Sequence, residues 1–233
     1  MKKILSTLII SLITVTTFGQ NVDEIVKKHI EAIGGKDNWA KVKSIKTSGT
    51  MKAQGAEIKI TIQQIDKKAS RQDIALMGMN GYNILTTTEG WNFMPFQGQT
   101  KPEPLTPDDV KKSQDGLNLM PEFITYKELG KKLEYLGKDD VDGTECFKLK
   151  MTDKENKETT FYIDPSTYYI IKQSSKVTLN GKEMEDASIM SNYKKQECGI
   201  VYPFSIVSGW GEMEVTALEI NPKIDESIFK VAK

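Results

Sequence analysis

Few side chains in this sequence have the types and spacing that catalysis requires. His29 is the only histidine, and its surroundings, KHIEAIGG, lack the second histidine of an H-E-x-x-H zinc site. A serine or cysteine nucleophile would have to use this histidine or a lysine as its base. The sequence contains no G-x-S-x-G elbow, P-loop or G-x-G-x-x-G motif. We therefore expect no enzyme and no cofactor, and we expect His29 to be a surface or boundary residue of a helix.

Acidic residues and cysteines offer a second kind of chemistry. Asp139, Asp140 and Asp142 are close in sequence but lack the spacing and the distal glutamate of a calcium loop. The segment DDVDG is typical of a hairpin turn, so we expect no metal site. Cys146 and Cys198 could form a disulfide in an oxidising compartment. A core of this size does not require a disulfide, so we favour two unpaired, at least partly buried thiols.

Apolar side chains suggest binding rather than catalysis. They gather around one hairpin and in the segment that follows it. Methionine adapts its shape to variable apolar ligands, although each of these residues alone is compatible with an ordinary core. Together they predict an apolar cavity. The residues are Met77, Met79, Trp91, Phe93, Met94 and Phe96 in the hairpin, and Leu117, Leu119, Met120, Phe123 and Ile124 after it.

The N-terminus has the pattern of an export signal. Lys2 and Lys3 precede an uncharged stretch from Ile4 to Val15, which is shorter than the roughly 20 apolar residues that cross a bilayer. Thr17 and Gly19 supply the small residues that predict cleavage after Gly19. The expected domains are therefore a signal peptide, 1–19, and one mature domain, 20–233. No cysteine stands at the junction to carry a lipid anchor, so we expect a soluble periplasmic protein.

Charge limits the partners that this domain could bind. The chain has 32 Lys and Arg against 32 Asp and Glu, and removal of the signal takes away two lysines. This balance argues against a nucleic acid partner, which requires a concentrated basic surface. Arg71 is the only arginine, so bidentate recognition of a carboxylate or phosphate is possible at one place at most.

The periodicity changes from helical to alternating along the chain. Asn21 can cap a helix over Val22–Ile33, and a short turn at Asp37–Lys41 follows, with Trp39 available to hold it. The segment EIKITIQQI then alternates Ile58, Ile60 and Ile62 with polar residues, as a half-buried strand does. Further strands follow, joined by tight turns that include DPST and Asn180-Gly181. Short strands with such turns predict one antiparallel meander.

A helical insertion interrupts the strands. Thr106 is its expected N-cap, Pro107 its first residue, and Pro121 the start of a second helical piece. Its apolar side must be buried, so we expect residues 106–127 to form a lid over one face of the sheet. A one-residue register error would send strand residues to the other face. The expected cavity and lid residues are Ile60, Ile62, Met77, Trp91, Phe93, Leu119, Met120, Phe123, Ile124, Phe147, Leu149, Phe161 and Ile163.

Turns and strand ends along the whole mature chain resemble a known family. The segments EIVKKHIEAIGGKDNWAKVKSIKTSGTM, EGWNFMPFQGQ, LGKDDVDGTECFKLKM, FYIDPSTYYIIKQ, CGIVYPFSIVSG and INPKIDESIFKV resemble outer membrane lipoprotein-sorting proteins, the LolA/LolB/LppX-like periplasmic carriers. The resemblance implies an unclosed antiparallel β-barrel (half-barrel) of about ten or eleven strands, with an N-terminal helix and a helical lid over its concave face. It also implies that Lys67, Lys68 or Arg71 takes the place of an arginine that the family uses in handover.

The expected function follows from that resemblance. It is a periplasmic carrier, a monomer, that shuttles lipoprotein acyl chains or lipids toward the outer membrane, from a possible inner-membrane donor complex to an outer-membrane receptor. A periplasmic lipid- or protein-sensing adaptor on the same fold is the alternative, and it would bind a protein partner without transferring lipid. A hydrolase of envelope lipids is a further alternative, and its turnover would depend on His29 or on a serine.

Overall fold

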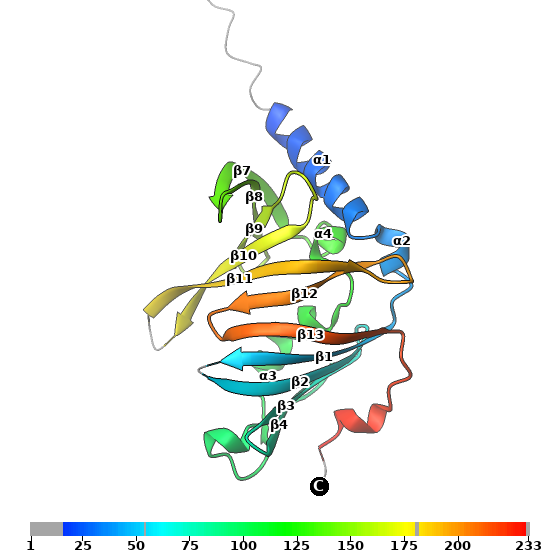
Figure 1. The fold of residues 1–233 in the computed structure, drawn as a ribbon, viewed down its shortest axis with the longest axis vertical. Coiled ribbons are helices and arrows are strands. Elements are labelled where there is room, and N and C mark those ends of the chain that lie inside the picture. The colour runs from blue at the N-terminus through cyan, green and yellow to red at the C-terminus, as the bar shows by residue number, and fades with distance from the viewer. Residues whose placement is uncertain (1–15, 54, 180–181, 232–233) are drawn as a thin grey trace, which may run out of the picture.

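One antiparallel sheet dominates the computed structural model, which describes residues 16–231 without 54 and 180–181 (Figure 1). In these residues the sheet has 13 strands in the order β6-β5-β4-β3-β2-β1-β13-β12-β11-β10-β9-β8-β7. The strands are β1 (Ser44–Ala53), β2 (Ala56–Ile65), β3 (Ala69–Leu76), β4 (Met79–Thr86), β5 (Gly90–Phe93), β6 (Glu103–Pro104), β7 (Lys132–Val141), β8 (Thr144–Thr152), β9 (Glu158–Ile163), β10 (Ile170–Leu179), β11 (Lys182–Lys195), β12 (Val201–Ser208) and β13 (Gly211–Ile220).

The sheet is a meander that does not close. Neighbouring strands follow one another in sequence, except that β1 pairs with β13 in the middle, and β6 and β7 remain at opposite edges. Edge strand β6 has two residues and ends at Pro104. Edge strand β7 has an irregular register between Tyr135 and Lys138, where Gly137 has a φ of 98°. The predicted ten or eleven strands are too few, because a two-residue strand such as β6 has no alternation to detect.

Alternation gives the two faces of the sheet different chemistry. The register places Thr47 opposite Ile62 and Gly49 opposite Ile60 on the inner face, which faces the inserted helices. On the outer face of the same strands Lys46 forms an ion pair with Glu219, with 2.8 Å between nitrogen and oxygen. Successive residues of a strand point to opposite faces, so the apolar half of β1 and β2 lines the inner face.

The N-terminal helix, α1 (Thr16–Ala32), packs one apolar stripe against the inner face near β8 and β9. Ile25 and Val26 are buried there with side chains of both strands. The prediction that Asn21 caps this helix is wrong, because the helix continues from Thr16 through that position without a break. Residues 1–15 of the predicted signal peptide lie outside the described residues, so the predicted cleavage stays a prediction.

Two glycines end α1 and lead to the short helix α2 (Lys36–Trp39). Gly34 has a φ of 106°, and a Cβ at this position would collide with the carbonyl of Gly199, so only glycine fits. Where a turn was predicted at Asp37–Lys41, the structure has this short helix with turn residues at 40–41. Trp39 holds it as expected: its side chain is buried, and Nε1 donates a hydrogen bond to the Ile33 carbonyl at 2.9 Å. This bond fixes the junction between α1 and β1.

The insert, defined here as residues 106–130, lies between β6 and β7 and contains α3 (Pro107–Lys112), the 3-10 helix η2 (Gln114–Leu117) and α4 (Glu122–Thr125). The Thr106 hydroxyl accepts a hydrogen bond from the Asp109 N–H, and Pro107 is the first helical residue, as predicted. Pro121 precedes α4, also as predicted. Figure 1 shows the insert behind the sheet, and hydrogen bonds described below attach it to the ends of the strands.

The C-terminal segment covers part of the outer face. It follows β13 and contains the 3-10 helix η3 (Glu226–Phe229); a second 3-10 helix, η1 (Pro95–Gln97), follows β5. Phe229 is buried against Ala69 and Ile84. Arg71 donates from Nη1 to the Ile228 carbonyl at 2.8 Å, and its guanidinium lies 4.6 Å from the centre of the Tyr82 ring. The far end of the chain thus fastens to β3 and β4.

The predicted DDVDG hairpin is confirmed at the β7–β8 turn, where Asp142 and Gly143 have positive φ. The predicted turn at Asn180-Gly181 lies outside the described residues. Cys146 and Cys198 are free, as favoured from the sequence. Cys146 is fully buried, and burial raises the pKa of its thiol to about 11. Cys198 is exposed, so the expectation of two partly buried thiols is wrong for this residue, which lies in the turn before β12.

Candidate functional site

An apolar cavity of about 380 Å³ lies between the insert and the inner face of the sheet. Its floor comes from β1, β2, β11 and β12, its cover from the loop 118–121, and one end from α1 and α2. The lining side chains are mostly apolar, as in pockets that hold small hydrophobic ligands. They include Ile33, Trp39, Ile45, Ile62, Leu119, Met120, Ile170, Met190, Tyr193, Val201 and Tyr202.

Strand register brings the floor residues together. Ile45 lies opposite Gln64, and Thr47 lies opposite Ile62, so all four side chains share the inner face. Tyr202 on β12 also lines this floor. Burial raises the pKa of Tyr202, although its hydrogen bond with Thr47 acts in the opposite direction. The phenol therefore stays uncharged at neutral pH, and the floor presents no net charge to a ligand.

His29 borders this cavity from α1 and is buried rather than at the surface, so the expectation of a surface or boundary residue is wrong. Its Nδ1 lies 2.7 Å from the Tyr168 carbonyl oxygen, and its ring contacts Phe123 edge to face at 5.1 Å. Burial lowers the pKa of His29, because the imidazolium loses solvation, while the bond to the carbonyl opposes this shift. His29 is therefore a neutral, satisfied part of the wall.

Hydrogen bonds attach the cover and the preceding residues 116–117 to β2 and to the β2–β3 turn. The Lys67 N–H donates to the Leu117 carbonyl at 2.7 Å, and the Leu119 N–H donates to Oδ1 of Asp66 at 3.0 Å. The side chain of Gln64 donates from Nε2 to the Gly116 carbonyl at 2.9 Å. The cover is thus attached by polar contacts at its rim while Leu119 and Met120 point into the cavity.

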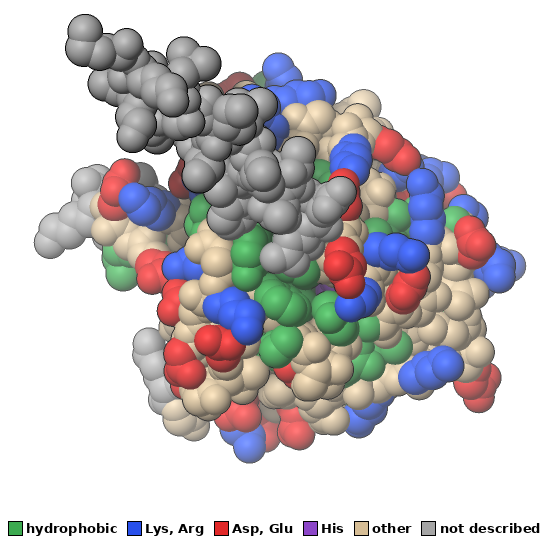
Figure 2. All heavy atoms as spheres, turned by 90° about the horizontal axis from the view of Figure 1, so that it is seen from above, with side chains coloured by type: hydrophobic (Ala, Val, Ile, Leu, Met, Phe, Trp, Pro, Cys, Tyr) green, Lys and Arg blue, Asp and Glu red, His purple; other side chains and the backbone are tan. Residues whose placement is uncertain are grey.

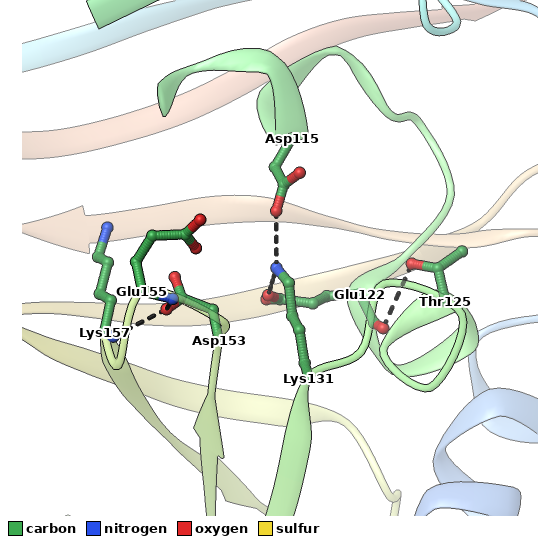
Figure 3. Close-up of polar contacts among 7 residues, drawn as sticks. All are labelled: Asp115, Glu122, Thr125, Lys131, Asp153, Glu155 and Lys157. Atoms are coloured by element: carbon green, nitrogen blue, oxygen red, sulfur yellow. Dashed lines mark hydrogen bonds and ion pairs between the residues drawn. The ribbon is translucent and has the colours of Figure 1, made fainter. Parts of the chain in front are cut away.

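A half-buried lysine holds the insert from the other side (Figure 3). Lys131, just before β7, reaches Asp115 of η2 at 3.0 Å and Glu122 of α4 at 2.7 Å. Its side chain is 11% exposed. Burial opposes its charge, yet the hydrogen bonds with Glu122 and Asp115 outweigh burial and raise the pKa of Lys131. One ammonium therefore links two parts of the insert to the start of the second half of the sheet.

The structure separates the predicted cavity residues into four groups. Ile62, Leu119 and Met120 line the apolar cavity. Ile60 lies in an adjacent floor cluster with Phe204 and Met213, and Ile124 packs beside the cavity against Trp39. Another group fills the space under α1 as solid core, namely Phe123, Phe147, Leu149, Phe161 and Ile163. The last group lies elsewhere, namely Met77, Trp91 and Phe93.

Met77 is 81% exposed in the β3–β4 turn, where its φ is 50°. The register pairs Ile84 with Trp91, and Tyr82 with Phe93. Trp91 packs with Ile84 and Phe229 under the C-terminal segment, and it also borders a second cavity. Phe93 packs on the Tyr82 ring, with 5.6 Å between centres. The side chains of Trp91 and Phe93 therefore belong to the outer face. Their neighbours in the strand, one position along, face the inner side.

Sequence reasoning missed several residues of the floor. Ile45, Met190 and Tyr202 are strand residues of the inner face, and their alternation was visible in the sequence. Ile170 and Tyr193 were hidden by register irregularities, since β10 shifts between Ile170 and Lys172 and Asn192 has positive φ. Only the pairing of the strands could have found them.

The family resemblance implies a role in handover for Lys67, Lys68 or Arg71. These three residues have different surroundings in the structure. Arg71 binds Asp73 as well as the C-terminal segment, with 2.7 Å between Nη2 and the carboxylate. Lys68 pairs with Glu226 at 2.6 Å on the surface. Lys67 lies in the β2–β3 turn with a φ of 54°. Arg71 thus has structural partners on the outer face, away from the apolar cavity.

Two further properties concern metals and membranes. In the part of the chain that the structure describes, no three His, Cys, Asp or Glu side chains are grouped to hold a metal ion. No helix of the described residues is both long and apolar enough to cross a membrane. Figure 2, which looks onto the molecule from the side of α1, shows hydrophobic side chains near the middle of this face with Lys and Glu or Asp side chains around them.

Solved structures share this architecture. A LolA superfamily protein from Nitrosomonas europaea has a TM-score of 0.54 at 13% identity, with 90% of this chain and 97% of that chain covered. A domain from Vibrio parahaemolyticus, provisionally described as an outer membrane lipoprotein-sorting protein, has 0.51 at 16%, covering 88% and 94%. A DUF1329 family protein from Desulfovibrio piger has 0.55 at 11%, covering 90% and 97%.

These likenesses extend over nearly the whole of each chain and confirm the predicted resemblance at the level of the fold. No family model matches the chain, and no curated protein matches it in sequence. The protein therefore has the LolA-like fold, an unclosed antiparallel sheet with helices on its inner face.

Proposed function

We propose that the protein is a periplasmic carrier that binds lipoprotein acyl chains or lipids and shuttles them toward the outer membrane. The observation that carries this proposal is the apolar cavity of about 380 Å³ between a polar-anchored insert and the inner face of the sheet. Its volume lies in the range of ligand pockets, roughly 300–1,000 Å³. The LolA-like fold supports the same reading, because a lipoprotein-sorting domain and a LolA superfamily protein share it.

The proposed mechanism is binding without covalent chemistry. The insert moves outward, acyl chains enter between Met120 and the floor, and the insert closes over them. Burial of apolar surface stabilises the complex by about 25 cal/mol per Å² before the cost of ordering the ligand and the insert. Release then requires a partner that binds the open form better, because only differential affinity shifts such an equilibrium. Periplasmic location rests on the predicted signal peptide, 1–19.

Binding can be tested on residues 20–233 purified from a bacterial periplasm without detergent. Native mass spectrometry should show bound lipid or lipopeptide, and a fluorescent fatty acid should bind after delipidation. The variant Ile62→Glu places a charge in the cavity and should abolish both signals. The matched control is Gln63→Glu, because this neighbouring side chain lies on the outer face beside Lys46 and Arg71.

The two substituted positions are neighbours in β2 and face opposite sides of the sheet. A difference in binding between the variants therefore depends on which face carries the new charge. Circular dichroism and thermal unfolding establish that both are folded before binding is compared. A clean apo mass together with no uptake of added lipid or lipopeptide by the unmodified protein would overturn the carrier proposal.

A further inference from the structure

A second cavity of about 660 Å³ lies beside the insert, against another part of the inner face, and differs in chemistry from the first. It extends between two parts of the inner face, one formed by β3 and β4 and the other by β8, β9 and β10. The insert borders it with Asp115, Gly116 and Glu122. A smaller hollow of about 310 Å³ adjoins both cavities, because it shares Asp115, Gly116 and Glu122 with this cavity and Asn118 and Met120 with the apolar one.

The first wall carries neutral hydrogen-bonding side chains where the floor strands carry apolar ones. Gln72 lies opposite Ile62 in the register, so it belongs to the inner face. Asn83 donates from Nδ2 to Oε1 of Gln72 at 3.3 Å, and Asn92 donates from Nδ2 to Oδ1 of Asn83 at 2.6 Å. In this row Oε1 of Gln72 accepts a hydrogen bond, so its Nε2 amide contributes two N–H donors to this wall.

The opposite wall has the same character. The register pairs Gln173 with Phe161 and Ser175 with Thr159, and Phe161 is an inner-face residue of the core. Gln173, Ser175 and Thr159 all border the cavity. Carboxamides and hydroxyls both donate and accept hydrogen bonds, so the two walls together offer donors and acceptors without charge.

Charged groups at the cavity balance one another. Lys131 is bound by Asp115 and Glu122, and Lys112 is bound by Asp108 on the surface of α3 at 3.0 Å. Asp153 and Lys157 are the remaining two charges; the Asp153 carboxylate accepts the backbone N–H of Lys157 at 2.8 Å, while the Lys157 ammonium points away from it (Figure 3). A phosphate group would need cations in excess, which this cavity does not supply, because its lysines and acids are equal in number.

We propose that this second cavity holds an uncharged, hydroxyl-rich head group, such as a sugar, of an amphiphile whose acyl chains occupy the apolar cavity. Neighbouring hydroxyls of a sugar present donor and acceptor together, and a carboxamide such as that of Gln72 meets both at once. This inference rests on the proposed carrier function and specifies its cargo as a glycolipid rather than a phospholipid or a lipopeptide.

The test compares ligands that share their acyl chains and differ in the head group. Diacylglycerol, monoglucosyl diacylglycerol, phosphatidylglycerol and a diacylated lipopeptide each displace a fluorescent fatty acid from residues 20–233. We expect the glucosyl lipid to bind about tenfold more tightly than phosphatidylglycerol, the gain that one or two net hydrogen bonds supply.

The double variant Gln72→Leu/Asn83→Leu should remove this advantage and leave the affinity for diacylglycerol unchanged. Ser175→Val on the opposite wall is a milder second variant, which serves if the double variant does not fold. Gln63→Leu, on the outer face of β2, is the matched control and should keep the preference.

Each outcome decides the question. Equal affinity for all head groups, or a preference for phosphatidylglycerol or for the lipopeptide, overturns the glycolipid inference while leaving the carrier function intact. Binding of none of the four lipids overturns both. A glucosyl preference that survives both wall variants also overturns the inference, because the head group would then lie elsewhere.

Discussion

Two regions of the inner face have similar apolar composition but opposite packing. Near β8 and β9, Leu149 and Phe161 are almost completely buried against Ile25 and Phe123. Around β1 and β2, Ile62 and its neighbours surround a cavity of about 380 Å³. The first region is a solid core and the second is hollow.

The difference comes from what covers each region. Helix α1 brings Ile25 and Val26 to the first region, and α4 adds Phe123, so the side chains of this region pack against one another. The second region is covered by the loop 118–121, which contributes Leu119 and Met120 on an irregular backbone. The side chains of a helix fill the space above the sheet, whereas this short loop covers the sheet and leaves a cavity beneath it. The following predictions test this distinction.

The largest effect should come from Phe123→Ala in the solid region. Phe123 is 2% exposed, and its ring contacts His29 at 5.1 Å and Phe161 at 4.9 Å. Loss of the ring leaves a cavity and should lower the free energy of unfolding by about 3–5 kcal/mol. Urea unfolding followed by tryptophan fluorescence measures this change. A loss below about 1 kcal/mol would show that this region is not tightly packed.

A smaller effect should follow when the link between the regions is cut by Lys131→Met. The change removes the ammonium that joins Asp115 and Glu122 and leaves their carboxylates without this partner. We expect a loss of about 1–2 kcal/mol, since both acids are partly exposed and solvent screens them. Hydrogen exchange should increase in residues 113–126 and not in β1 or β2. A uniform increase throughout the chain would contradict a local role for this lysine.

In the hollow region, Ile62→Ala should cost only about 1 kcal/mol, because the removed atoms already face a cavity and leave fewer contacts unmade. The same change should weaken binding of a fluorescent fatty acid. Ile62→Ala should therefore affect binding more than stability, whereas Phe123→Ala should affect stability more than binding. A loss of stability as large as that of Phe123→Ala would mean that the cavity collapses in solution.

The smallest effect concerns pH and the boundary between the regions, where His29 contacts Phe123 and borders the cavity. Burial lowers the pKa of His29 below its ordinary value of 6.5, so the unfolded chain binds a proton more readily than the folded one. The stability from this residue is therefore complete above about pH 6.5 and decreases as pH falls from there through the folded pKa.

The variant His29→Gln, which can still donate to the Tyr168 carbonyl, should lose less stability than the unmodified protein between pH 7.5 and 5.5. Unfolding in urea at the two pH values measures the difference, and acidic residues contribute equally to both proteins. Identical pH dependence would show that His29 is hydrated.

Much of the fold could be predicted because its signals are local. The alternation of Ile58, Ile60 and Ile62 and the capping residues Thr106 and Pro107 determine their own elements. The outer-face positions of Trp91 and Phe93 were missed because they depend on distant contacts. Phe229 covers that face from the end of the chain, so an apolar hairpin residue there is core without lining a cavity.

The candidate site was predicted in part for the same reason. Leu119, Met120 and Ile62 were identified, but whether an apolar inner-face residue meets a helix or a space depends on the path of α1, which no local pattern encodes. Phe161 and Ile62 are both apolar strand residues of the inner face, and they differ in what packs on them.

An unclosed sheet has two open edges, which can promote self-association. Its two edge strands expose backbone groups that could pair with the same edges of another molecule. Here β6 stops after two residues at Pro104, which has no N–H to donate, and β7 is interrupted at Gly137 and carries Lys132, Glu134 and Lys138. These features oppose the addition of a strand from another molecule, so the sheet can stay open without promoting fibril-like growth.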